Sequence, residues 1–409
     1  MISPESEKIR SVRNRLKELC CSHGADYPGD GAGFSGKILE KETGLCFSDI
    51  DYSSALRSEW PAKQHLERLL RILANDRGVT EENRDLCLGL LDFWLNEDPV
   101  NPNWWHNEIG TPRLLGMAAA SMYDSLSPER IMRVRGIMRR GSPRGNPKCA
   151  ERAGANLIWG MVNTVYLAIL EEDGEMIRFA AEKTASELIA SDGIKDGIKP
   201  DMSFLQHKGI NYTFGYGRSF VNELCRLLYI LSGTDFMPEP DKIRLFEDFI
   251  LEGCASFSLF GTADYQTVGR EIARPGATSV SGFGKSLLLL CGLPEIGQRE
   301  KIAAYGGEIL SGTAPRGTSS AVRAFPDPNM ITAHSDGCYM SAKCSDTVFR
   351  CSEAGNGENY LGYNLFDGGT VCFMADGNEY SGAFPVWDNT LIPGVTTVYE
   401  KEEEHLYHK

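Results

Sequence analysis

From the N-terminus to about residue 310, the chain is a succession of short amphipathic segments, each with its own helix-start signal. Ser127-Pro128-Glu129, for example, combines a capping serine, a first-turn proline and a first-turn acid. Apolar residues at helical spacing follow each start, so each helix must bury one face against a neighbour. The pattern therefore predicts roughly ten helices stacked in antiparallel pairs, as a helical bundle or an α/α toroid.

The other helix starts share this pattern, and they lie at Ser3-Pro4-Glu5, Trp60-Pro61 and Thr80 with Glu81 and Glu82. Further helical segments are expected at 155–170, 176–190, 220–231 and 243–251.

After about residue 315 the chain changes to short β-branched and aromatic runs separated by turn residues. The runs are Thr347-Val348-Phe349, 370–373 and 395–398, and hairpin turns are expected at 367–369 and 376–378. The predicted fold class is therefore α+β and multidomain. A helical domain is expected over residues 1–312, followed over residues 313–409 by the opening strands of an antiparallel β domain.

The charge balance restricts the possible partners. A net charge of −14 argues against a nucleic-acid partner, so an anionic ligand would need a locally basic cleft. No apolar run approaches the roughly 18 residues needed to cross a bilayer, and Met1 to Arg10 lacks the apolar core of a signal peptide. The twelve cysteines form no C-x-x-C zinc pattern. We interpret them as buried thiols of a reducing compartment, with a disulfide network as the alternative.

Paired tryptophans form the first candidate binding motif, Asn103-Trp104-Trp105 followed by Glu108-Ile109-Gly110. Indole rings beside a glycine-containing bend suit a sugar platform, because the apolar face of a pyranose ring packs on them. Core packing against the next helix is the alternative.

Three further motifs carry groups suited to chemistry or binding. The stretch 206–218 holds His207, Tyr212 and Tyr216 between glycines, which indicates a loop open to a ligand or a connection covering the core. Arg270 and Arg274 are four residues apart, so in a helix they would share a face and could clamp a carboxylate or sulfate, or simply be solvated. The run 353–359 packs acids and amides into a Gly-rich turn, for which a calcium loop or a plain turn is the alternative.

In their order and spacing, these motifs resemble polysaccharide lyase family 8, the hyaluronate, chondroitin AC and xanthan lyases. Besides the segments above, the resemblance rests on Gly154-Ala155-Asn156, Gln206-His207, Tyr216-Gly217, Trp387-Asp388 and Ile392 to Thr397, and it covers most of the chain. It implies an N-terminal α/α toroid, an incomplete barrel of helix pairs, followed by the start of an antiparallel β-sandwich. It also implies an acidic, uronate-containing polysaccharide or oligosaccharide as substrate, cleaved by β-elimination without a metal or organic cofactor.

The resemblance also implies roles for individual residues. Substrate binding would fall to Asn103, Trp104, Trp105, Asn356 and Trp387. Catalysis would involve Asn156 at the uronate carboxylate, His207 and Tyr216 in proton transfer and Arg270 beside the tyrosine, with Arg274 oriented by Glu353 and Asn356.

The chemistry of uronate elimination explains these residue types. Removing the C5 proton builds negative charge on the adjacent carboxylate, which a neutral amide such as that of Asn156 would stabilise. Tyr216 could serve as the base if Arg270 lowers its pKa, because a nearby opposite charge favours the phenolate. It could then return the proton to the leaving oxygen, with His207 assisting.

Some features depart from the family pattern. Leu157, Asn389 and Val395 replace residues that are more usual there, and the chain stops shortly after the last motif, where members continue into further strands. We therefore expect exposed apolar sheet surface and poor solubility unless a partner covers it. The family is usually exported, so an extracellular or cell-surface location is expected, with the cytoplasm as the alternative.

Two other functions fit parts of the pattern. A glycoside hydrolase on an α/α toroid would need two flanking carboxylic acids, for which Glu108, Asp201 and Glu353 are candidates. A truncated, non-catalytic glycan-binding protein would keep the tryptophan platform without turnover.

Overall fold

The computed structural model describes residues 4–21, 31–313, 321–335, 337–344, 353–359, 369–388, 391 and 394. The chain divides into two compact units. The first comprises Met1–Arg152, Asn156–Thr184 and Leu227–Met237, and the second Ala153–Ala155, Ala185–Arg226 and Pro238–Lys409. Helices α6 (Gly154–Glu171), α7 (Gly174–Ser186) and α8 (Tyr216–Leu231) each contribute residues to both units.

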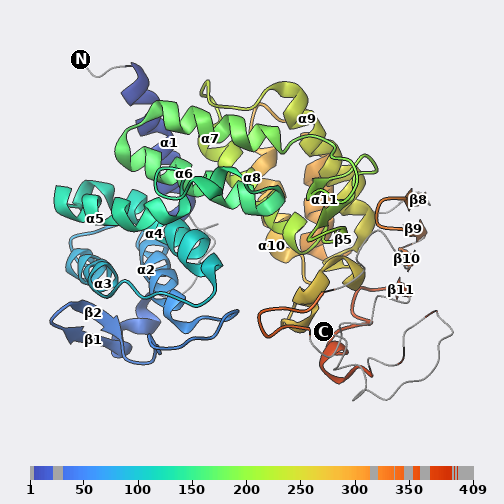
Figure 1. Ribbon diagram of the computed structural model, residues 1–409, viewed down its shortest axis with the longest axis horizontal. Helices are drawn as coiled ribbons and strands as arrows, with labels where there is room; N and C mark the ends of the chain where they lie inside the picture. The colour runs from blue at the N-terminus through green and yellow to red at the C-terminus, as the bar shows by residue number, and fades with distance from the viewer. Residues whose placement is uncertain are drawn as a thin grey trace. The chain divides into compact units, whose positions relative to one another are not determined.

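Helices dominate the first unit (Figure 1). Besides most of α6 and α7 and the last part of α8, they are α1 (Pro4–Cys21), α2 (Gln64–Asn75), α3 (Arg84–Glu97), α4 (Thr111–Met122) and α5 (Pro128–Met138). Helix α4 packs against α1, α2 and α5. A Cβ at Gly116 of α4 would lie 2.7 Å from Met138 Cε and 2.9 Å from Tyr166 Cβ, so this position requires glycine. A hairpin of β1 (Ile38–Lys41) and β2 (Gly44–Phe47) lies against α3.

The sequence located most helix starts correctly. Ser127 caps α5, because its side chain accepts a hydrogen bond from the backbone N–H of Arg130. The start expected at Thr80 is displaced, since α3 begins at Arg84. The amide oxygen of Asn83 accepts from the Thr80 N–H, at 2.8 Å, and holds 80–83 in a turn instead.

The helices of the second unit are the first part of α8, α9 (Pro240–Asp248), α10 (Ser281–Cys291) and α11 (Arg299–Ser311). Glycines let α10 and α11 approach closely, because a Cβ at Gly284 would meet Ile309 Cγ2 at 2.8 Å. Short antiparallel strands β3 (Gly197–Ile198), β4 (Phe204–Gln206) and β5 (Ile210–Asn211) form a small sheet, and β6 (Ser258–Leu259) pairs with β7 (Thr262–Ala263). The β4–β5 turn carries part of the candidate site.

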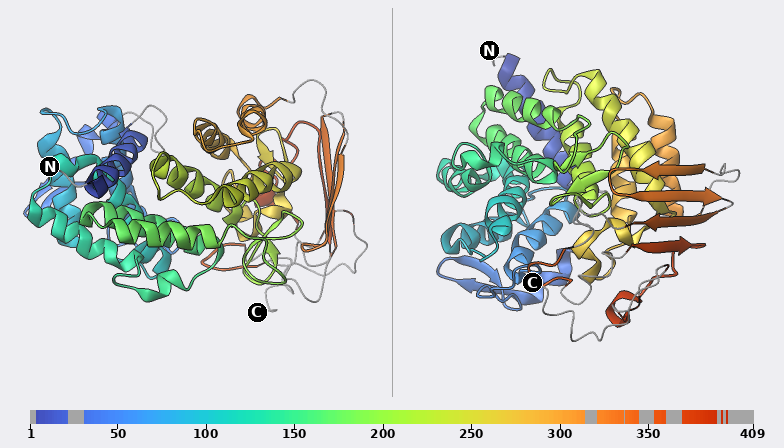
Figure 2. Two further views of the ribbon diagram at one scale, coloured as in Figure 1. Left: turned by 90° about the horizontal axis from the view of Figure 1, so that it is seen from above. Right: turned by 45° about the vertical axis from the view of Figure 1, so that its right-hand side comes forward.

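A four-stranded antiparallel sheet follows α11 in the sequence, in the order β11-β10-β9-β8 (Figure 2, right). Its strands are β8 (Ala321–Phe325), β9 (Met330–Ser335), β10 (Cys338–Lys343) and β11 (Thr370–Met374). The strand expected at 370–373 is confirmed. Those expected at 347–349 and 395–398, with most of the turn at 367–369, lie outside the described residues. Residues 376–378 form a bend held by the Glu379 carboxylate, which accepts from the N–H groups of Asp376 and Gly377.

The two faces of this sheet differ in chemistry. On one face Tyr339, Ser341 and Cys372 are buried, and the first two donate hydrogen bonds to the buried carboxylate of Asp264. The other face exposes large apolar side chains, namely Val322, Ile331, Met340 and Phe373. Strand alternation explains the division. The sequence predicted such an exposed apolar sheet surface, and its effect on solubility stays a prediction.

Three other sequence predictions can be placed on the structure. The helical pattern ends with α11 at Ser311, where Gly312 adopts the left-handed conformation of a C-cap, and strands begin at Ala321. The domain boundary at 312 itself stays a prediction. The cysteines of the described residues are free, and most are buried. Among the described residues no helix combines the length and apolar character that a membrane span needs.

Candidate active site

His207 lies at the tip of the β4–β5 turn, where the backbone is unusual. His207 and Lys208 both adopt positive φ, 55° and 71°, before Gly209 at 96°. Positive φ is uncommon for residues with a side chain, and consecutive examples persist only where surrounding contacts hold them. One such contact is the carboxylate of Asp196, which accepts from the His207 N–H at 3.0 Å. The turn therefore presents the imidazole in a fixed position.

Glu353 fixes the tautomer of His207. Its carboxylate oxygens lie 2.9 and 3.0 Å from His207 Nδ1, so Nδ1 carries the proton and donates to them. Nε2 then keeps a lone pair whenever the ring is neutral. Arg270 Nη1 lies 3.5 Å from the same Nδ1, but both atoms are donors, so this approach is a packing contact. The imidazole is 31% exposed and reachable by a ligand.

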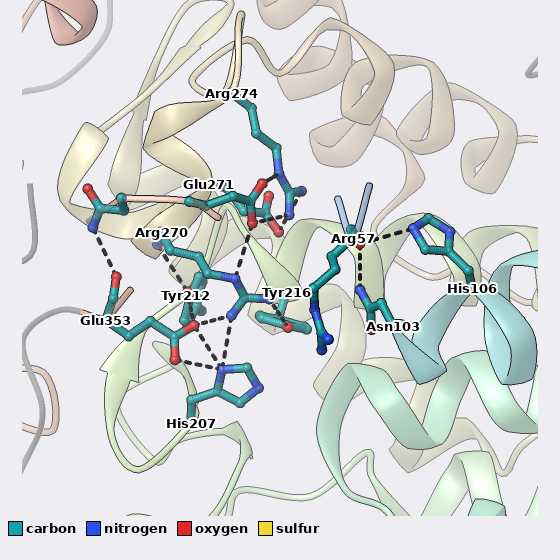
Figure 3. Close-up of polar contacts among 12 residues, drawn as sticks. Arg57, Asn103, His106, His207, Tyr212, Tyr216, Arg270, Glu271, Arg274 and Glu353 are labelled. Atoms are coloured by element: carbon teal, nitrogen blue, oxygen red, sulfur yellow. Dashed lines mark hydrogen bonds and ion pairs between the residues drawn. The ribbon is translucent and has the colours of Figure 1, made fainter. Parts of the chain in front are cut away.

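Arg270 connects the acidic and phenolic groups of this cluster (Figure 3). It lies in the 3-10 helix η10 (Gly269–Ala273). Its Nη2 donates to Tyr216 Oη at 2.9 Å, its Nη1 donates to Glu353, and its Nε lies 3.3 Å from Glu358 Oε2. Burial lowers the pKa of Arg270, but the neighbouring tyrosines and Glu353 outweigh burial and raise it overall. The guanidinium is therefore a permanent positive charge beside the Tyr216 oxygen.

Tyr216 corrects two expectations. The stretch 206–218 was interpreted as a loop open to a ligand or a connection covering the core, yet helix α8 begins at Tyr216, four residues before the predicted start at 220. The pKa of Tyr216 was expected to be lowered by Arg270. Burial instead raises this pKa above its ordinary value of 10, and Arg270 only offsets part of that effect. Tyr216 is therefore a phenol at neutral pH in the free protein.

Tyr212 is a member of the cluster to which the sequence gave no role. Its fully buried hydroxyl donates to Glu353 Oε1 at 2.5 Å and accepts from the Arg270 N–H at 3.1 Å. Its ring meets that of Tyr216 edge-on, with centroids 5.0 Å apart. The signal was its position in the same Gly-rich stretch as His207 and Tyr216. Tyr212 positions both Glu353 and Arg270.

Two glycines leave the room that the Tyr212 ring occupies. A Cβ at Gly215 would lie 2.4 Å from Tyr212 Cδ1, and one at Gly269 would lie 2.0 Å from Cε1. Gly269 also has a φ of +57°, which residues with a side chain rarely adopt. The glycines of both motifs thus have a packing function.

The substitution Gly269→Ala should lower the free energy of unfolding by at least about 2 kcal/mol, because it adds steric overlap to an unfavourable φ. Gly276→Ala is the matched control, since Gly276 has a φ of +68° with no atom within 4 Å of the added Cβ. Urea unfolding of both variants separates the two costs. Equal losses would show that the Tyr212 ring does not require this glycine.

Arg274 corrects a further expectation. It was predicted to be oriented by Glu353 and Asn356, but its Nε and Nη2 donate to Glu358, at 2.5 and 3.1 Å, and its Nη1 pairs with Glu271 at 3.3 Å. Glu353 instead pairs with Arg270. The cause is that Arg274 follows η10 in extended conformation, so the two arginines do not share a helix face. Glu358 accepts from both arginines, a role that the sequence motif contained but did not reveal.

Glu353 gives the cluster an expected dependence on pH. Burial raises the pKa of Glu353, but His207, Arg270 and Tyr212 outweigh burial and lower it from 4.5 to about 2. A lowered pKa stabilises the fold above pH 4.5, and that contribution is lost as the pH falls from there to about 2. It amounts to on the order of 3 kcal/mol. Urea unfolding of the wild type and Glu353→Gln should therefore differ most above pH 5 and converge toward pH 2. A gap that does not change with pH would contradict this assignment.

The tryptophan motif belongs to the first unit. Trp104 is 43% exposed, and the guanidinium of Arg152 lies over its ring, 4.5 Å from the centroid. Arg152 is held by an ion pair with Glu108, which also accepts from Asn146 at 2.7 Å. Trp105 is half-buried and packs edge-on against Trp159. Trp104 is therefore the accessible ring, and the sequence missed the cation beside it.

Asn103 organises the turn that carries these rings. It is buried, its amide nitrogen donates to the Arg57 carbonyl at 2.8 Å, and its amide oxygen accepts from the Trp105 N–H at 3.2 Å (Figure 3). His106 also contacts the Arg57 carbonyl. Both polar atoms of the Asn103 side chain thus serve the fold.

The three remaining predicted site residues lie on three different segments of the chain. Asn156 is half-buried in the first turn of α6, directly after Ala155, whose N–H lies 3.4 Å from Gln206 Oε1. Asn356 lies in the 353–359 turn at a φ of 55°. Trp387 packs with Tyr380 and Phe384 in a nearly parallel group and donates to the Leu391 carbonyl at 3.2 Å. The roles assigned to these three residues stay predictions.

The described residues contain no cluster of three histidine, cysteine or acidic side chains suited to a metal ion. Within the second unit, the candidate site comprises His207, Tyr212, Tyr216, Arg270 and Glu353. Arg274 is joined to Arg270 through Glu358, which accepts hydrogen bonds from both. The site offers an imidazole of fixed orientation, a buried phenol and paired guanidinium groups, which suits proton transfer beside an anion.

Two domains of one family match this chain. The N-terminal α-helical domain of polysaccharide lyase family 8 matches residues 62–304, and the super-sandwich domain of the same family matches residues 320–409. The chain belongs to polysaccharide lyase family 8.

Individual relatives are distant. Chondroitinase-AC of Pedobacter heparinus is 25% identical over 86% of this chain and 50% of its own length. Hyaluronate lyase of Thermasporomyces composti is 28% identical over 74% of this chain and 43% of its own, and xanthan lyase of a Bacillus species is 24% identical over 77% and 38%. The chain thus spans half or less of the length of these relatives.

Solved structures confirm the predicted fold class, an α/α toroid followed by an antiparallel β domain. A chondroitinase AC lyase studied in oligosaccharide complexes has a TM-score of 0.85 at 21% identity, covering 96% of this chain and 58% of its own. Paenibacillus xanthan lyase has a TM-score of 0.75 at 18% identity, covering 96% and 42%.

Proposed function

We propose that the protein is a polysaccharide lyase that cleaves an acidic, uronate-containing glycan of the chondroitin or hyaluronan type by β-elimination, leaving a 4,5-unsaturated uronate. Its family and the names of its relatives support a lyase acting on acidic polysaccharides. The observation that carries the proposal is the cluster around Arg270, which joins a phenol to a histidine whose tautomer is fixed by Glu353.

His207 takes the C5 proton in the proposed reaction. Glu353 accepts from Nδ1, so Nε2 is the basic atom, and the carboxylate stabilises the imidazolium that forms. As the C5–H bond breaks, its electron pair forms the C4–C5 double bond, and the C4–O bond breaks with its pair going to the glycosidic oxygen. In this proposed reaction His207 is the base, a role that the sequence analysis assigned to Tyr216.

Tyr216 donates a proton to the leaving oxygen. Its raised pKa keeps it a phenol before the reaction, and Arg270 at 2.9 Å stabilises the phenolate that the donation leaves. The ring centroids of His207 and Tyr216 are 4.7 Å apart. The proton held by His207 can therefore return to Tyr216 and restore the starting state.

The role proposed for Asn156 is to stabilise the negative charge on the substrate carboxylate by hydrogen bonding. The dianion that develops on C5 deprotonation needs a hydrogen-bond donor, and an amide supplies one without adding charge. Trp104, exposed in the first unit, is the proposed stacking surface for a sugar ring. Asn356 and Trp387 are retained as substrate-binding candidates.

The hydrolase alternative has less support from the three candidate acids. Glu108 is engaged by Arg152 and Asn146, Asp201 accepts from the N–H groups of Ser203 and Asp327, and Glu353 accepts from His207 and Arg270. A general acid needs a proton at neutral pH, and the low pKa of Glu353 opposes that role.

Ultraviolet absorbance combined with a reducing-end assay tests the proposal on chondroitin, hyaluronan and xanthan. A lyase yields both the conjugated unsaturated uronate and new reducing ends, whereas a hydrolase yields reducing ends alone. A non-catalytic glycan-binding protein yields neither. Reducing ends without absorbance would refute the elimination.

A further inference from the structure

A cavity of about 540 Å³ adjoins His207 within the second unit. Its wall is formed mainly by the segment 186–197, together with Ala153, His207 and Lys208. Two of the lining side chains, Ile189 and Ile194, are large, apolar and about half exposed. Such a volume holds a sugar ring or two, and apolar walls with a few polar groups are typical of ligand pockets.

The charged groups of the cavity are not equally engaged. Its two carboxylates are occupied by backbone donors, since Glu187 accepts from the Gly154 N–H at 2.5 Å and Asp196 from the His207 N–H at 3.0 Å. The ammonium groups of Lys195 and Lys208 form no hydrogen bond or ion pair within the described part of the chain. The cavity thus offers two cations without a partner among the described residues, on a protein whose net charge is −14.

The segment that carries Lys195 is held from beneath by a buried lysine. Lys199 is fully buried, and its Nζ donates to Ser191 Oγ at 2.9 Å and to the Lys195 carbonyl. The backbone of Lys208 is also constrained, because Lys208 follows His207 in the left-handed turn. Lys195 and Lys208 therefore both lie on ordered backbone, which reduces the conformational entropy lost when a ligand binds.

We propose that this cavity is an anion subsite, in which Lys195 and Lys208 bind a sulfate ester or carboxylate on a sugar adjacent to the reacting uronate. Ile189 and Ile194 pack against the apolar face of that sugar. The inference rests on the proposed function for the position of the reacting sugar. Because the cavity shares His207 with the candidate active site, a group bound there is within one or two sugars of the bond that breaks.

The test compares wild type with the Lys195→Gln/Lys208→Gln variant on a sulfated chondroitin and on the same material after chemical desulfation. Loss of both cations should lower kcat/KM on the sulfated chain by about 10- to 100-fold. A loss confined to the sulfated chain identifies the sulfate ester, and an equal loss on both identifies the carboxylate. Lys285→Gln, on the exposed surface of α10, is the matched control and should match wild type. Unchanged kcat/KM on both chains would overturn the subsite.

A binding measurement keeps this test separate from the proposed function. Calorimetric titration with a sulfated chondroitin oligosaccharide reports affinity whether or not the protein turns it over. If the wild type makes no unsaturated product, the proposed function fails, and the subsite still stands or falls on this affinity. The double lysine variant should bind at least about 10-fold more weakly than wild type, with the difference shrinking at high salt. Equal affinities would overturn the subsite independently.

Discussion

The substitution Tyr216→Phe is expected to lower kcat by about 100- to 1000-fold, with a much smaller change in KM. The phenol is the proposed proton donor to the leaving oxygen, and phenylalanine keeps the ring and its edge-on contacts while removing that proton. Steady-state kinetics on chondroitin, followed by ultraviolet absorbance, measures the effect.

A control separates lost chemistry from lost stability. Tyr305→Phe removes the hydroxyl of another buried tyrosine in the second unit, which hydrogen-bonds Ser258 Oγ at 2.7 Å. Both variants should lose similar stability, on the order of 1 kcal/mol, but only Tyr216→Phe should lose turnover. Full activity in Tyr216→Phe would remove Tyr216 from the mechanism.

The substitution Arg270→Met should lower the free energy of unfolding by about 3 to 5 kcal/mol, because it leaves the carboxylates of Glu353 and Glu358, whose side chains are only 14% and 7% exposed, without their shared cation. It should also lower kcat by at least about 100-fold, since the Tyr216 phenolate then loses the cation that donates to its oxygen. Urea unfolding and steady-state kinetics measure the two effects. Arg270→Lys restores the charge without the planar fork, so it should recover stability only partly.

Arg244→Met gives the reference for an exposed ion pair. Arg244 pairs with Asp248 on α9 and is 61% exposed, so its loss should cost at most about 1 kcal/mol. A comparable loss at Arg270 would mean that the cluster does not depend on this guanidinium.

Local sequence signals predicted the start of a helix or the presence of a strand well where one or a few residues determine the local backbone conformation. Ser127 caps α5 as expected, and the strand at 370–373 forms where β-branched and aromatic side chains favour extended backbone. The start of α8 was misplaced, because glycine and tyrosine at 215–217 have little helix propensity and burial of Tyr216 overrides it. Propensity is a weak guide at a site where packing determines the backbone.

The sequence indicated several residues of the candidate site, but it did not predict which of them pair with one another. His207, Tyr216, Arg270 and Glu353 lie together, but Glu353 pairs with Arg270 while Arg274 pairs with Glu358, and Tyr212 joins the group. The catalytic roles of these residues stay predictions. The spacing of Arg270 and Arg274 suggested a shared helix face, whereas a 3-10 helix followed by extended backbone turned each toward its own acid. The pKa of Tyr216 was misjudged because burial, which a sequence does not display, outweighs a neighbouring charge.

The mass balance of a defined substrate tests the central claim most directly. A purified chondroitin oligosaccharide is digested with the protein, and the masses of the two products are measured. Elimination moves a hydrogen from C5 to the leaving oxygen without consuming water, so the two masses should sum to that of the substrate, with one product absorbing in the ultraviolet. A sum exceeding the substrate by one water would show hydrolysis and contradict the proposed mechanism.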